Sequence, residues 1–573
     1  MLLAWTHFNL ITRSTFRNGP ATMSLPFRPG GANRPVALKP CNPVRRRHNG
    51  RDMADLTSSP SAGAPGARTE AFYAGAALLL LGALGVLRLW VVQGFELQGD
   101  EAYYWLWSKH LDYGYYSKGP GIAAAIWAGT RLFGDTVLGV RFTSVLLSVL
   151  SGLALFEMGR RLFDARTGFW TVVLAATIPL FIAGSLLMTI DPLSVFCWLA
   201  AVLTFWKAAN TERAAPGWWI ATGGLIGLGM LCKFTNAAQI VSFLLFCLWA
   251  PGARRHLRRP GFYLMILTAA AFLAPVLLWN ERHGWITAQH LTHRGALDQA
   301  FRPQPGATLE FWATQALVFS PLYFAGLVWA LCRKEWNGPR ARPFRYLLSL
   351  AAPLPVFYTV LSLNGKWEAN WTAPALAVCP VLLAASWLAA GPWRPGLRRW
   401  VAGSIALGVV LTAGLHAALV TPFMYGDGRF RRIGGAEDLA RQVARAQQEL
   451  GAAFVICGGY QVAALMSFYL PGQPTAFIVD EPGIQNQFSL WPGYGASRRA
   501  GESAIFVGKS PVAPEELAPQ FESVALLGEV WSHYHGKNLR TYALFLCRGL
   551  KTGAVAAKPD APRISRMMPG HPW

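Results

Sequence analysis

The sequence predicts a polytopic α-helical membrane protein with about 11 spans, followed by a small C-terminal α/β domain. Of the 573 residues, 53% are hydrophobic and only 14% are charged, whereas soluble globular domains carry about 25% charged residues. Apolar segments recur throughout residues 71–421, and each approaches the ~20 residues that an α-helix needs to cross a bilayer. After residue 421 the pattern changes to short strand-like runs and amphipathic helices, which indicates a separate domain.

The first 70 residues are rich in Pro, Arg, Gly and Ser and include three consecutive arginines at 45–47. Such a composition buries no core, so we expect a disordered, basic, cytoplasmic segment. Its many prolines oppose the amphipathic helix of a targeting peptide. An alternative interpretation is that translation starts at Met53.

The spans follow in order, with boundaries that are soft by several residues. We expect them at 71–94, 137–157, 168–187, 191–208, 217–232, 236–251, 261–280, 311–332, 344–364, 372–390 and 401–421. A polar loop at 95–136 separates the first two, and a second long loop lies at 281–310. Together they form a predicted transmembrane domain, 71–421.

Basic residues orient these spans. With a cytoplasmic N-terminus, every short inner loop is rich in Arg or Lys, as in Gly159–Arg166 and Arg254–Arg259, and the outer loops are poorer for their length. Since cytoplasmic loops carry this excess, loop 95–136 and the C-terminal domain should lie outside the cytoplasm. The net charge of +23 therefore reflects membrane topology, and we expect no nucleic-acid partner.

The predicted C-terminal domain covers 422–550, and the tail 551–573 should be disordered. Its expected helices are 436–450 and 460–470, and its expected strands are 453–457, 476–479, 504–507, 524–527 and 542–546. Cys457 and Cys547 fall in this domain. They either form a disulfide, which an extracytoplasmic location permits, or stay as two buried thiols.

Loop 95–136 holds the first candidates for chemistry. Asp100 and Glu101 are adjacent carboxylates, either a solvated pair or part of a site. Aromatic residues crowd the same loop, among them Tyr103, Tyr104, Tyr115 and Tyr116. Such aromatics either mark the membrane interface or line a sugar or lipid site, because they combine contact area with a polar hydroxyl.

Asp191 lies between two apolar runs and precedes Pro192. It either caps a helix or belongs to a site, since ionisable residues near membrane depth are functional candidates.

Three lysines fall at predicted outer helix ends: Lys118, Lys233 and Lys366. A single one would be expected to extend its ammonium to the interface. Three on the face that is poor in basic residues favour a phosphate-binding role. Lys366 stands in the polar turn 364–371 with Trp367, Glu368 and Asn370, which is either an interfacial belt or a second wall of the site.

Metal and nucleotide sites have little support. His290 and His293 have helical spacing and His283 lies nearby, but no Cys or carboxylate accompanies them at a spacing typical of zinc sites. We therefore expect solvated histidines. No P-loop, nucleophile elbow or dinucleotide-binding glycine motif occurs.

In order along the chain, Asp-Glu-Ala-Tyr-Tyr at 100–104, Tyr-Tyr-Ser-Lys-Gly-Pro at 115–120, the Asp191-Pro192 turn and Gly-Lys-Trp-Glu-Ala-Asn-Trp at 365–371 resemble the GT-C glycosyltransferases. The similarity covers about 70–420 and is greatest to the bacterial lipid A aminoarabinose transferases and the protein O-mannosyltransferases.

The resemblance implies a GT-C fold and a polyprenyl- or dolichyl-phosphate sugar donor, with inverting transfer of the sugar outside the cytoplasm. By motif, Asp100 would be the catalytic carboxylate, Asp191 a second one and Lys118 a ligand of the donor phosphate. Glu101, Lys233, Lys366 and Glu368 join them by position only. Some relatives bind a divalent metal, for which this sequence shows no clear ligand set.

We expect an enzyme of the bacterial inner membrane that glycosylates a glycolipid or a cell-surface polysaccharide, as in lipopolysaccharide biosynthesis. One alternative is transfer to protein Ser or Thr. Another is a membrane transporter or flippase, which predicts ionisable residues at mid-span; here the polar residues gather at one surface.

Overall fold

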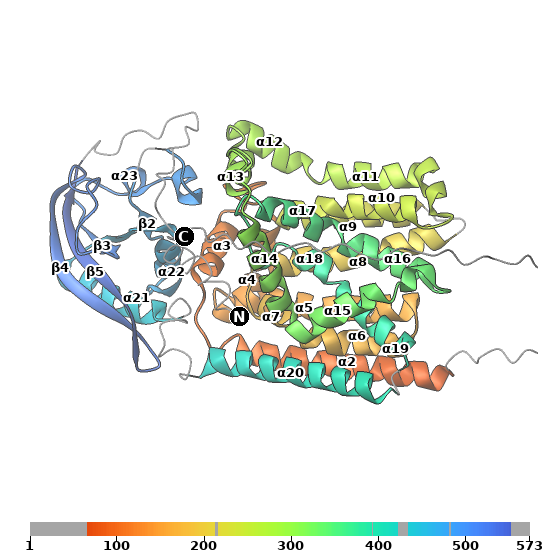
Figure 1. The fold of residues 1–573 in the computed structure, drawn as a ribbon. Coiled ribbons are helices and arrows are strands. Elements are labelled where there is room, and N and C mark those ends of the chain that lie inside the picture. Colours follow the sequence, from red (N-terminus) through yellow and green to blue (C-terminus); the bar gives the residue numbers. More distant parts are fainter. Residues whose placement is uncertain (1–65, 212–215, 392–393, 422–433, 481–482, 552–573) are drawn as a thin grey trace, which may run out of the picture.

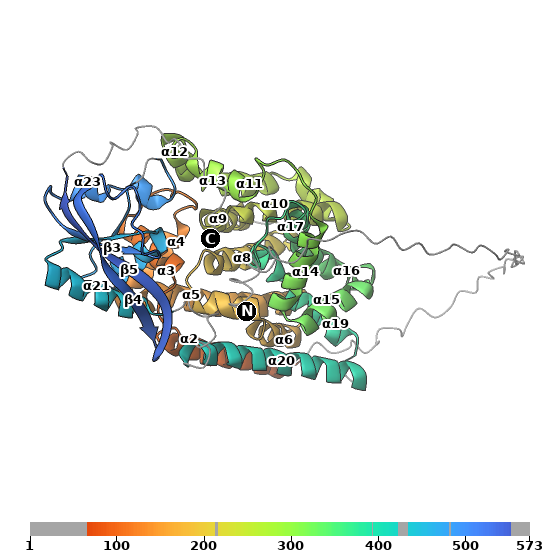
Figure 2. The same cartoon turned by 60° about the vertical axis from the view of Figure 1, so that its left-hand side comes forward.

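The computed structural model describes residues 66–211, 216–391, 394–421, 434–480 and 483–551. A bundle of helices lying side by side makes up most of the molecule, and a small α/β unit stands at one end of it (Figures 1 and 2). The predicted disordered ends, 1–70 and 551–573, lie almost entirely outside these residues.

Six long apolar segments of the bundle have the length and composition of membrane spans. They are α2 (Ala67–Val91), α5 (Val137–Leu162), α8 (Asp191–Asn210), α11 with α12 (Pro260–Ala271 and Ala274–Arg282), α16 with α17 (Ala341–Ala351 and Pro353–Ser362), and α20 (Pro395–Val420). The protein is therefore an integral membrane protein, as its hydropathy predicts.

Two further spans are bent. Helices α6 (Ala165–Ala176) and α7 (Pro179–Leu186) meet at 72°, and α14 (Pro305–Phe319) meets the segment that begins with α15 (Pro321–Cys332) at 106°. Proline opens the second helix of each pair. Because proline lacks an N–H and clashes with the preceding turn, it is tolerated at a helix start and breaks a helix interior.

Three more predicted spans are shorter helices: α9 (Pro216–Cys232), the segment 234–249 with α10 (Ala238–Trp249), and the segment 373–389 with α18 (Ala373–Leu376) and α19 (Cys379–Ala389). Every predicted span thus has a helical counterpart. The count of about 11 stays a prediction, because these three are shorter than a full crossing.

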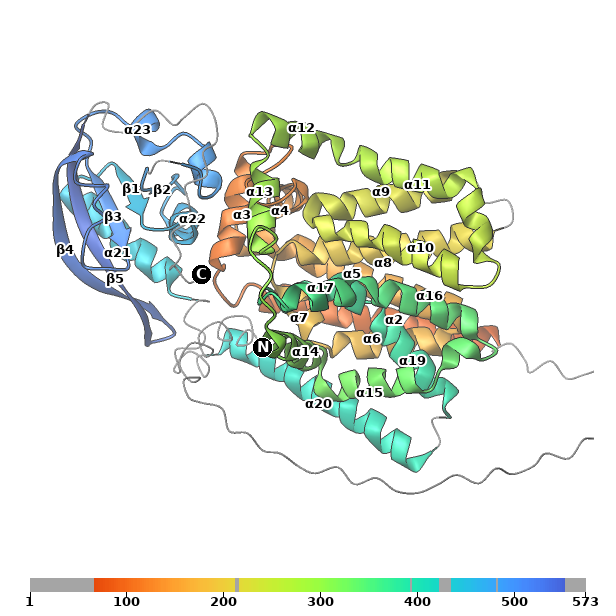
Figure 3. The same cartoon turned by 45° about the horizontal axis from the view of Figure 1, so that its top comes forward.

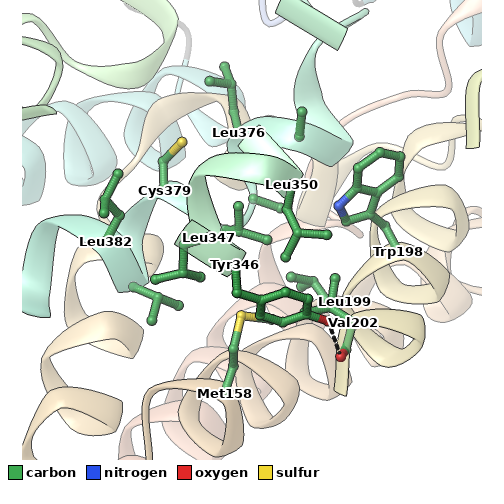
Figure 4. Close-up of a cluster of buried hydrophobic side chains, with 14 of the residues drawn as sticks. Met158, Trp198, Leu199, Val202, Tyr346, Leu347, Leu350, Leu376, Cys379 and Leu382 are labelled. Atoms are coloured by element: carbon green, nitrogen blue, oxygen red, sulfur yellow. Dashed lines mark hydrogen bonds between the residues drawn. The ribbon is translucent and has the colours of Figure 1, made fainter. Parts of the chain in front are cut away.

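The centre of the bundle is an apolar core, to which helices that are distant in sequence contribute. Leu199 and Val202 of α8 pack against Leu347 and Leu350 of α16 (Figure 4). The hydroxyl of Tyr346 donates a hydrogen bond of 2.6 Å to the carbonyl oxygen of Val202. This bond satisfies the hydrogen-bonding capacity of the buried Tyr346 hydroxyl.

Loop 95–136 folds into two helices, α3 (Gly99–Lys109) and α4 (Gly121–Phe133). A capping box starts α3: the side chain of Gln98 accepts from a backbone N–H, and Glu101 accepts from the N–H of Gln98 at 3.0 Å. The second long loop contains α13 (Ile286–Arg294), which lies at the bundle end that faces the α/β unit (Figures 1 and 3).

The C-terminal unit is a five-stranded sheet in the order β2-β1-β3-β5-β4. Its elements are α21 (Ala436–Leu450), β1 (Phe454–Cys457), α22 (Tyr460–Tyr469), β2 (Phe477–Ile478), α23 (Tyr494–Ser497), β3 (Ala504–Gly508), β4 (Phe521–Tyr534) and β5 (Lys537–Leu550). The predicted strands 524–527 and 542–546 are the centres of one long antiparallel hairpin. Cys457 and Cys547 are free, buried thiols on strands that β3 separates.

The C-terminal unit is packed against the loop helices. Glu96 accepts from the backbone N–H of Ala436 at 2.6 Å and so caps α21. Leu97 donates its N–H to the hydroxyl of Tyr469 at 2.7 Å. One hydrophobic cluster also runs through α3, α4, α21 and α22, with Trp105 edge-on to Phe468. Helix α22 is thereby fixed beside α3.

Candidate functional site

Glu101 is held in a fully buried ion pair. Its carboxylate accepts from Nε and Nη2 of Arg141 at 2.8 and 2.6 Å, and from the backbone N–H of Met188 at 2.9 Å. Both side chains are at most 1% exposed. Every oxygen of Glu101 is occupied, which supports a structural role in place of the predicted catalytic one. The pair ties α3 to α5 and to the segment that leads into Asp191.

Asp100 is one position away and faces the other direction. Its Oδ1 accepts from the side-chain amide of Gln461 at 2.9 Å, and the hydroxyl of Tyr460 lies 3.5 Å away. Both partners belong to α22, so the C-terminal unit contributes directly to the environment of Asp100. Neither residue stands out in the sequence, since nothing local to residues 460–461 indicates which loop they meet.

Asp191 belongs to a second cluster that joins three predicted residues. Its Oδ1 accepts from Nζ of Lys233 at 2.7 Å, and its Oδ2 accepts from the amide of Asn370 at 2.6 Å. Lys233 also donates to the carbonyl oxygen of Asn370 at 3.0 Å. Asp191 is the first residue of α8, and the N-cap position is Ile190. Both of its carboxylate oxygens accept from Lys233 and Asn370, which favours a role in this cluster over capping alone.

Lys118 is placed by a turn that presses against the end of α9. A Cβ on Gly119 would lie 2.4 Å from the carbonyl oxygen of Leu231, and one on Gly121 would lie 2.4 Å from the sulfur of Cys232. Only glycine permits this approach. It places the Lys118 turn beside the end of α9, which Lys233 directly follows.

The charges of this region converge on Lys118. Burial, together with the positive charges of Arg294 and Lys233, lowers the pKa of the Lys118 ammonium to about 7, against the opposing effect of Asp191 and Asp100. An additional anion bound beside Lys118 would reduce the repulsion among the cations Lys118, Arg294 and Lys233. The arrangement can therefore hold a phosphate between cations and next to two carboxylates.

Arg294, the last residue of α13, is a member of this cluster that sequence reasoning missed. Its guanidinium lies 3.4 Å from Glu368, and its charge acts on Lys118 and Tyr104. The available signal was an arginine in a predicted outer loop, where basic residues are sparse.

The turn 364–371 contributes unequally. Asn370 joins Asp191, and Glu368 faces Arg294; burial raises the pKa of the Glu368 carboxyl. Trp367 packs edge-on against Phe311. Lys366 is exposed, and no contact of its side chain with Lys118 or Lys233 is found among the described residues.

Of the four predicted tyrosines, only Tyr104 lies close to the candidate carboxylates. Tyr104 is near Asp100 and Asp191, whose charges act on it. Tyr103 accepts from the N–H of Gln487 and stacks on Phe488, so it belongs to the junction with the C-terminal unit. Tyr115 and Tyr116 are buried in the loop that carries Lys118. Both side chains are packed inside the protein, and neither is found in contact with Asp100 among the described residues.

The histidines of the second long loop form no metal centre in the described part of the chain. His283 stacks on Trp279, His290 packs against Tyr116, and His293 pairs with Asp298 at 2.8 Å. No group of three or more His, Cys, Asp or Glu residues converges within the described ranges. The residues present therefore do not fit a divalent metal site of the usual kind.

An apolar cavity of about 130 Å³ runs from this cluster into the bundle. Asp191 and Asn370 line it, and its walls come mainly from α2, α5, α6, α7 and α8. A hydrophobic chain attached to a phosphate would have its head at the charged cluster and its tail in such a cavity.

Comparison with known proteins shows that the chain is similar to glycosyltransferases. Residues 117–279 match a family described as dolichyl-phosphate-mannose-protein mannosyltransferase. The chain is 28% identical over 381 residues to a lipid A galacturonosyltransferase of Rhizobium johnstonii, covering 65% of this chain and 77% of that protein. It is also 28% identical over 282 residues to an undecaprenyl phosphate-α-4-amino-4-deoxy-L-arabinose arabinosyl transferase of Pseudomonas aeruginosa, covering 47% of this chain and 49% of that protein.

The fold has a solved counterpart. The structure of ArnT from Cupriavidus metallidurans bound to undecaprenyl phosphate superposes with a TM-score of 0.59 at 18% identity, covering 85% of this chain and 99% of that one. The chain spans about half the length of the arabinosyl transferase of P. aeruginosa. These comparisons confirm the predicted resemblance, the predicted fold class and the predicted enzyme class.

Proposed function

We propose that this chain, a glycosyltransferase with the GT-C fold, moves a monosaccharide from a polyprenyl-phosphate carrier to a lipid A-type glycolipid. The observation that carries the proposal is that the charges of Asp100, Arg294 and Asp191 all act on Lys118, and that Asp191 lines an apolar cavity. Its relatives are named for lipid A and for an undecaprenyl-phosphate sugar, which supports both substrates.

Asp100 serves as the general base. The acceptor hydroxyl attacks the anomeric carbon of the sugar, and its proton passes to the Asp100 carboxylate as the new C–O bond forms. For this step the acceptor has to reach the oxygen that Gln461 now contacts at 2.9 Å. Tyr460 and Gln461 therefore border the acceptor side of the site.

Lys118 and Arg294 stabilise the departing group. The bond between the anomeric carbon and the phosphate oxygen breaks, and its electron pair stays on the polyprenyl phosphate. Two cations fixed beside that oxygen stabilise the developing charge. Attack from the face opposite the phosphate inverts the anomeric configuration. The cluster of Asp191, Lys233 and Asn370 holds the sugar end of the donor at the cavity mouth.

The test is sugar transfer in proteoliposomes that contain a radiolabelled undecaprenyl-phosphate sugar and lipid A. We expect Asp100→Asn to lower transfer at least about 100-fold with little change in donor binding. Lys118→Ala should weaken donor binding about tenfold or more. Lys109→Ala is the matched control, because this lysine of the same loop is exposed and pairs with Asp135.

Wild-type rates in both Asp100→Asn and Lys118→Ala would refute the site. Transfer to a Ser- or Thr-containing peptide in place of lipid A would support the mannosyltransferase activity for which the matching family is named. Uptake of solute without sugar transfer would support the transporter alternative.

The proposed orientation places the site and the C-terminal unit on the periplasmic face of a bacterial inner membrane. The basic inner loops support it. A cysteine introduced at exposed Lys366 should then react with a membrane-impermeant maleimide in intact spheroplasts. Reaction only after lysis would reverse the orientation.

A further inference from the structure

Arg88 is a buried arginine on the wall of the apolar cavity. It lies three residues before the end of α2 (Ala67–Val91) and is only 5% exposed. Leu81 and Leu84 of the same helix line the cavity beside it, and Leu147 and Leu155 of α5 face it from the opposite wall. A buried guanidinium in apolar surroundings is a candidate functional group, since charged residues within membrane spans are rare and usually functional.

The charge of Arg88 has no counter-ion in the described part of the chain. Nη1 donates to the hydroxyl of Ser148 at 3.1 Å, and Nε is buried without a hydrogen-bond partner. No described carboxylate lies within ion-pairing distance. His416 of α20 lies close enough for the charge of Arg88 to act on it, and a protonated imidazole would not offset that charge.

Arg141 shows how the same protein treats a buried arginine that has only a structural role. Its guanidinium pairs with Glu101 and donates to the carbonyl oxygens of Val92, Phe95 and Glu96. Every nitrogen is satisfied. Arg88 donates to one serine hydroxyl instead, and its side chain lines the cavity, so the guanidinium can still donate to a group that enters there.

The cavity restricts what that group can be. Its walls are apolar apart from Arg88, the serines Ser148, Ser151 and Ser185, and the Asp191 end. An occupant must carry an anion at the level of Arg88 and an apolar chain along the leucines. We propose that Arg88, with Ser148 and Ser151, binds the phosphate group of a membrane lipid, as an anion site separate from the donor-phosphate cations Lys118 and Arg294.

The two anion sites are separate because only one of them lines the cavity. Arg88, Ser148 and Ser151 are among the lining residues, whereas Lys118 and Arg294 are not. Two lipid phosphates can therefore be bound by this protein at two places. The site at Arg88 suits a phosphorylated lipid that waits beside the reaction or leaves it, such as the carrier after transfer or an anionic bilayer lipid. Both share the phosphate that Arg88 recognises.

The test measures lipid binding to the full chain in phosphatidylcholine nanodiscs by native mass spectrometry and thermal unfolding. Three probes are compared: undecaprenyl phosphate, phosphatidic acid and the phosphate-free dioleoylglycerol. The variants are Arg88→Gln, Arg88→Lys and Lys118→Ala, with exposed Arg131 of α4 changed to Gln as the matched control.

We expect Arg88→Gln to weaken binding of phosphate-bearing lipids roughly tenfold to a hundredfold, because it removes charge-assisted hydrogen bonds. Arg88→Lys should retain part of the affinity, and Arg131→Gln all of it. Lys118→Ala should still bind a phosphate lipid through Arg88, which separates this site from the donor site. Loss limited to undecaprenyl phosphate identifies the carrier as occupant, whereas equal loss of phosphatidic acid identifies bilayer lipids.

Unchanged affinity of Arg88→Gln for both phosphate lipids would overturn the proposal. If that variant fails to fold, the Lys118→Ala protein decides. Phosphatidic acid should raise its unfolding temperature more than dioleoylglycerol does. An equal effect of the two lipids would overturn the proposal as well.

Discussion

Adjacent carboxylates on α3 have opposite environments because successive residues of an α-helix point about 100° apart. Glu101 turns into the bundle and meets Arg141, whereas Asp100 turns toward α22 and the charged cluster. The sequence motif presents the two as a pair of equal candidates. The side of the helix on which each lies places Glu101 in the packed interior and Asp100 beside the charged cluster, where we propose its chemical role.

The pair of Glu101 and Arg141 gives a first prediction. Glu101→Gln leaves a buried guanidinium without its counter-ion, so we expect a loss of about 3–5 kcal/mol in the free energy of unfolding. The double variant Glu101→Leu with Arg141→Met should recover much of this loss, because no charge is then buried. Thermal unfolding in detergent measures both. A double variant less stable than Glu101→Gln would contradict this account.

Lys118 gives a second prediction, which concerns pH. Its pKa is lowered to about 7, so in the free enzyme the Lys118 ammonium loses its proton as pH rises from about 6 to 8. A lysine with an ordinary pKa stays protonated over this range. Donor affinity should fall across that window. Lys118→Arg keeps its charge and should flatten the profile. The measurement is the KM for donor between pH 6 and 9, and an identical profile in both enzymes would exclude Lys118 as the cause.

At the scale of elements, the site depends on how closely the turn before α4 meets the end of α9. Gly119 and Gly121 allow contact with Leu231 and Cys232, and that contact brings the Lys118 turn to the end of α9. The bent pairs of helices act on the same scale. The break between α6 and α7 leaves α7 free to line the cavity beside Asp191.

Gly119→Ala tests this contact. A Cβ 2.4 Å from a backbone carbonyl oxygen forces the turn away from α9, so we expect donor affinity to fall at least about tenfold, with a stability loss of about 1–3 kcal/mol. Gly217→Ala at the start of α9 is the control, since no atom lies within 4 Å of its added Cβ. Equal effects of the two substitutions on donor affinity would show that the close approach is unimportant.

For the whole molecule, the decisive contact is between the bundle and the C-terminal unit. Glu96 caps α21 across this junction, and burial raises the pKa of its carboxyl to about 7. Between about pH 4.5 and 7 the folded state keeps a proton that the unfolded state has lost. Docking of the C-terminal unit should therefore weaken as pH rises through this window.

The expected weakening between pH 5 and 8 is on the order of 1–3 kcal/mol. Hydrogen exchange at the amides of Ala436 and Glu437 measures it. Glu96→Gln cannot ionise, so its exchange protection should change less with pH than that of the wild type. Protection that rises with pH in the wild type would contradict the assignment.

The sequence is a good guide wherever one local property decides the structure. Hydropathy predicts a helical segment for every expected span, but α3, α4 and α13 lie in stretches predicted as loops. The helix Ala436–Leu450 is predicted with its observed ends because its periodicity is strong. The long β4–β5 hairpin is predicted only as two short strands, since its exposed outer residues break the apolar pattern. Its sharp turn at His535 and Gly536 has positive φ at both positions, a conformation that glycine favours.

The site is less predictable because local sequence properties do not decide which of its residues come together. Asp100, Asp191 and Lys118 are visible as polar residues in an apolar chain. Arg294 and Gln461 are not, because each is an ordinary residue in a polar stretch until the fold brings it to α3. What decides their role is long-range contact, which no local pattern encodes.

The contact between Asp100 and Gln461 also sets an order of events during synthesis. The two residues are 361 positions apart, so at roughly 5–20 residues per second the ribosome needs roughly 20–70 s to travel from one to the other. During that interval the membrane helices that follow α2 are made while the carboxylate lacks its partner on α22. The proposed site is thus completed only after the C-terminal unit has been translated, and a polypeptide released before Gln461 lacks this contact.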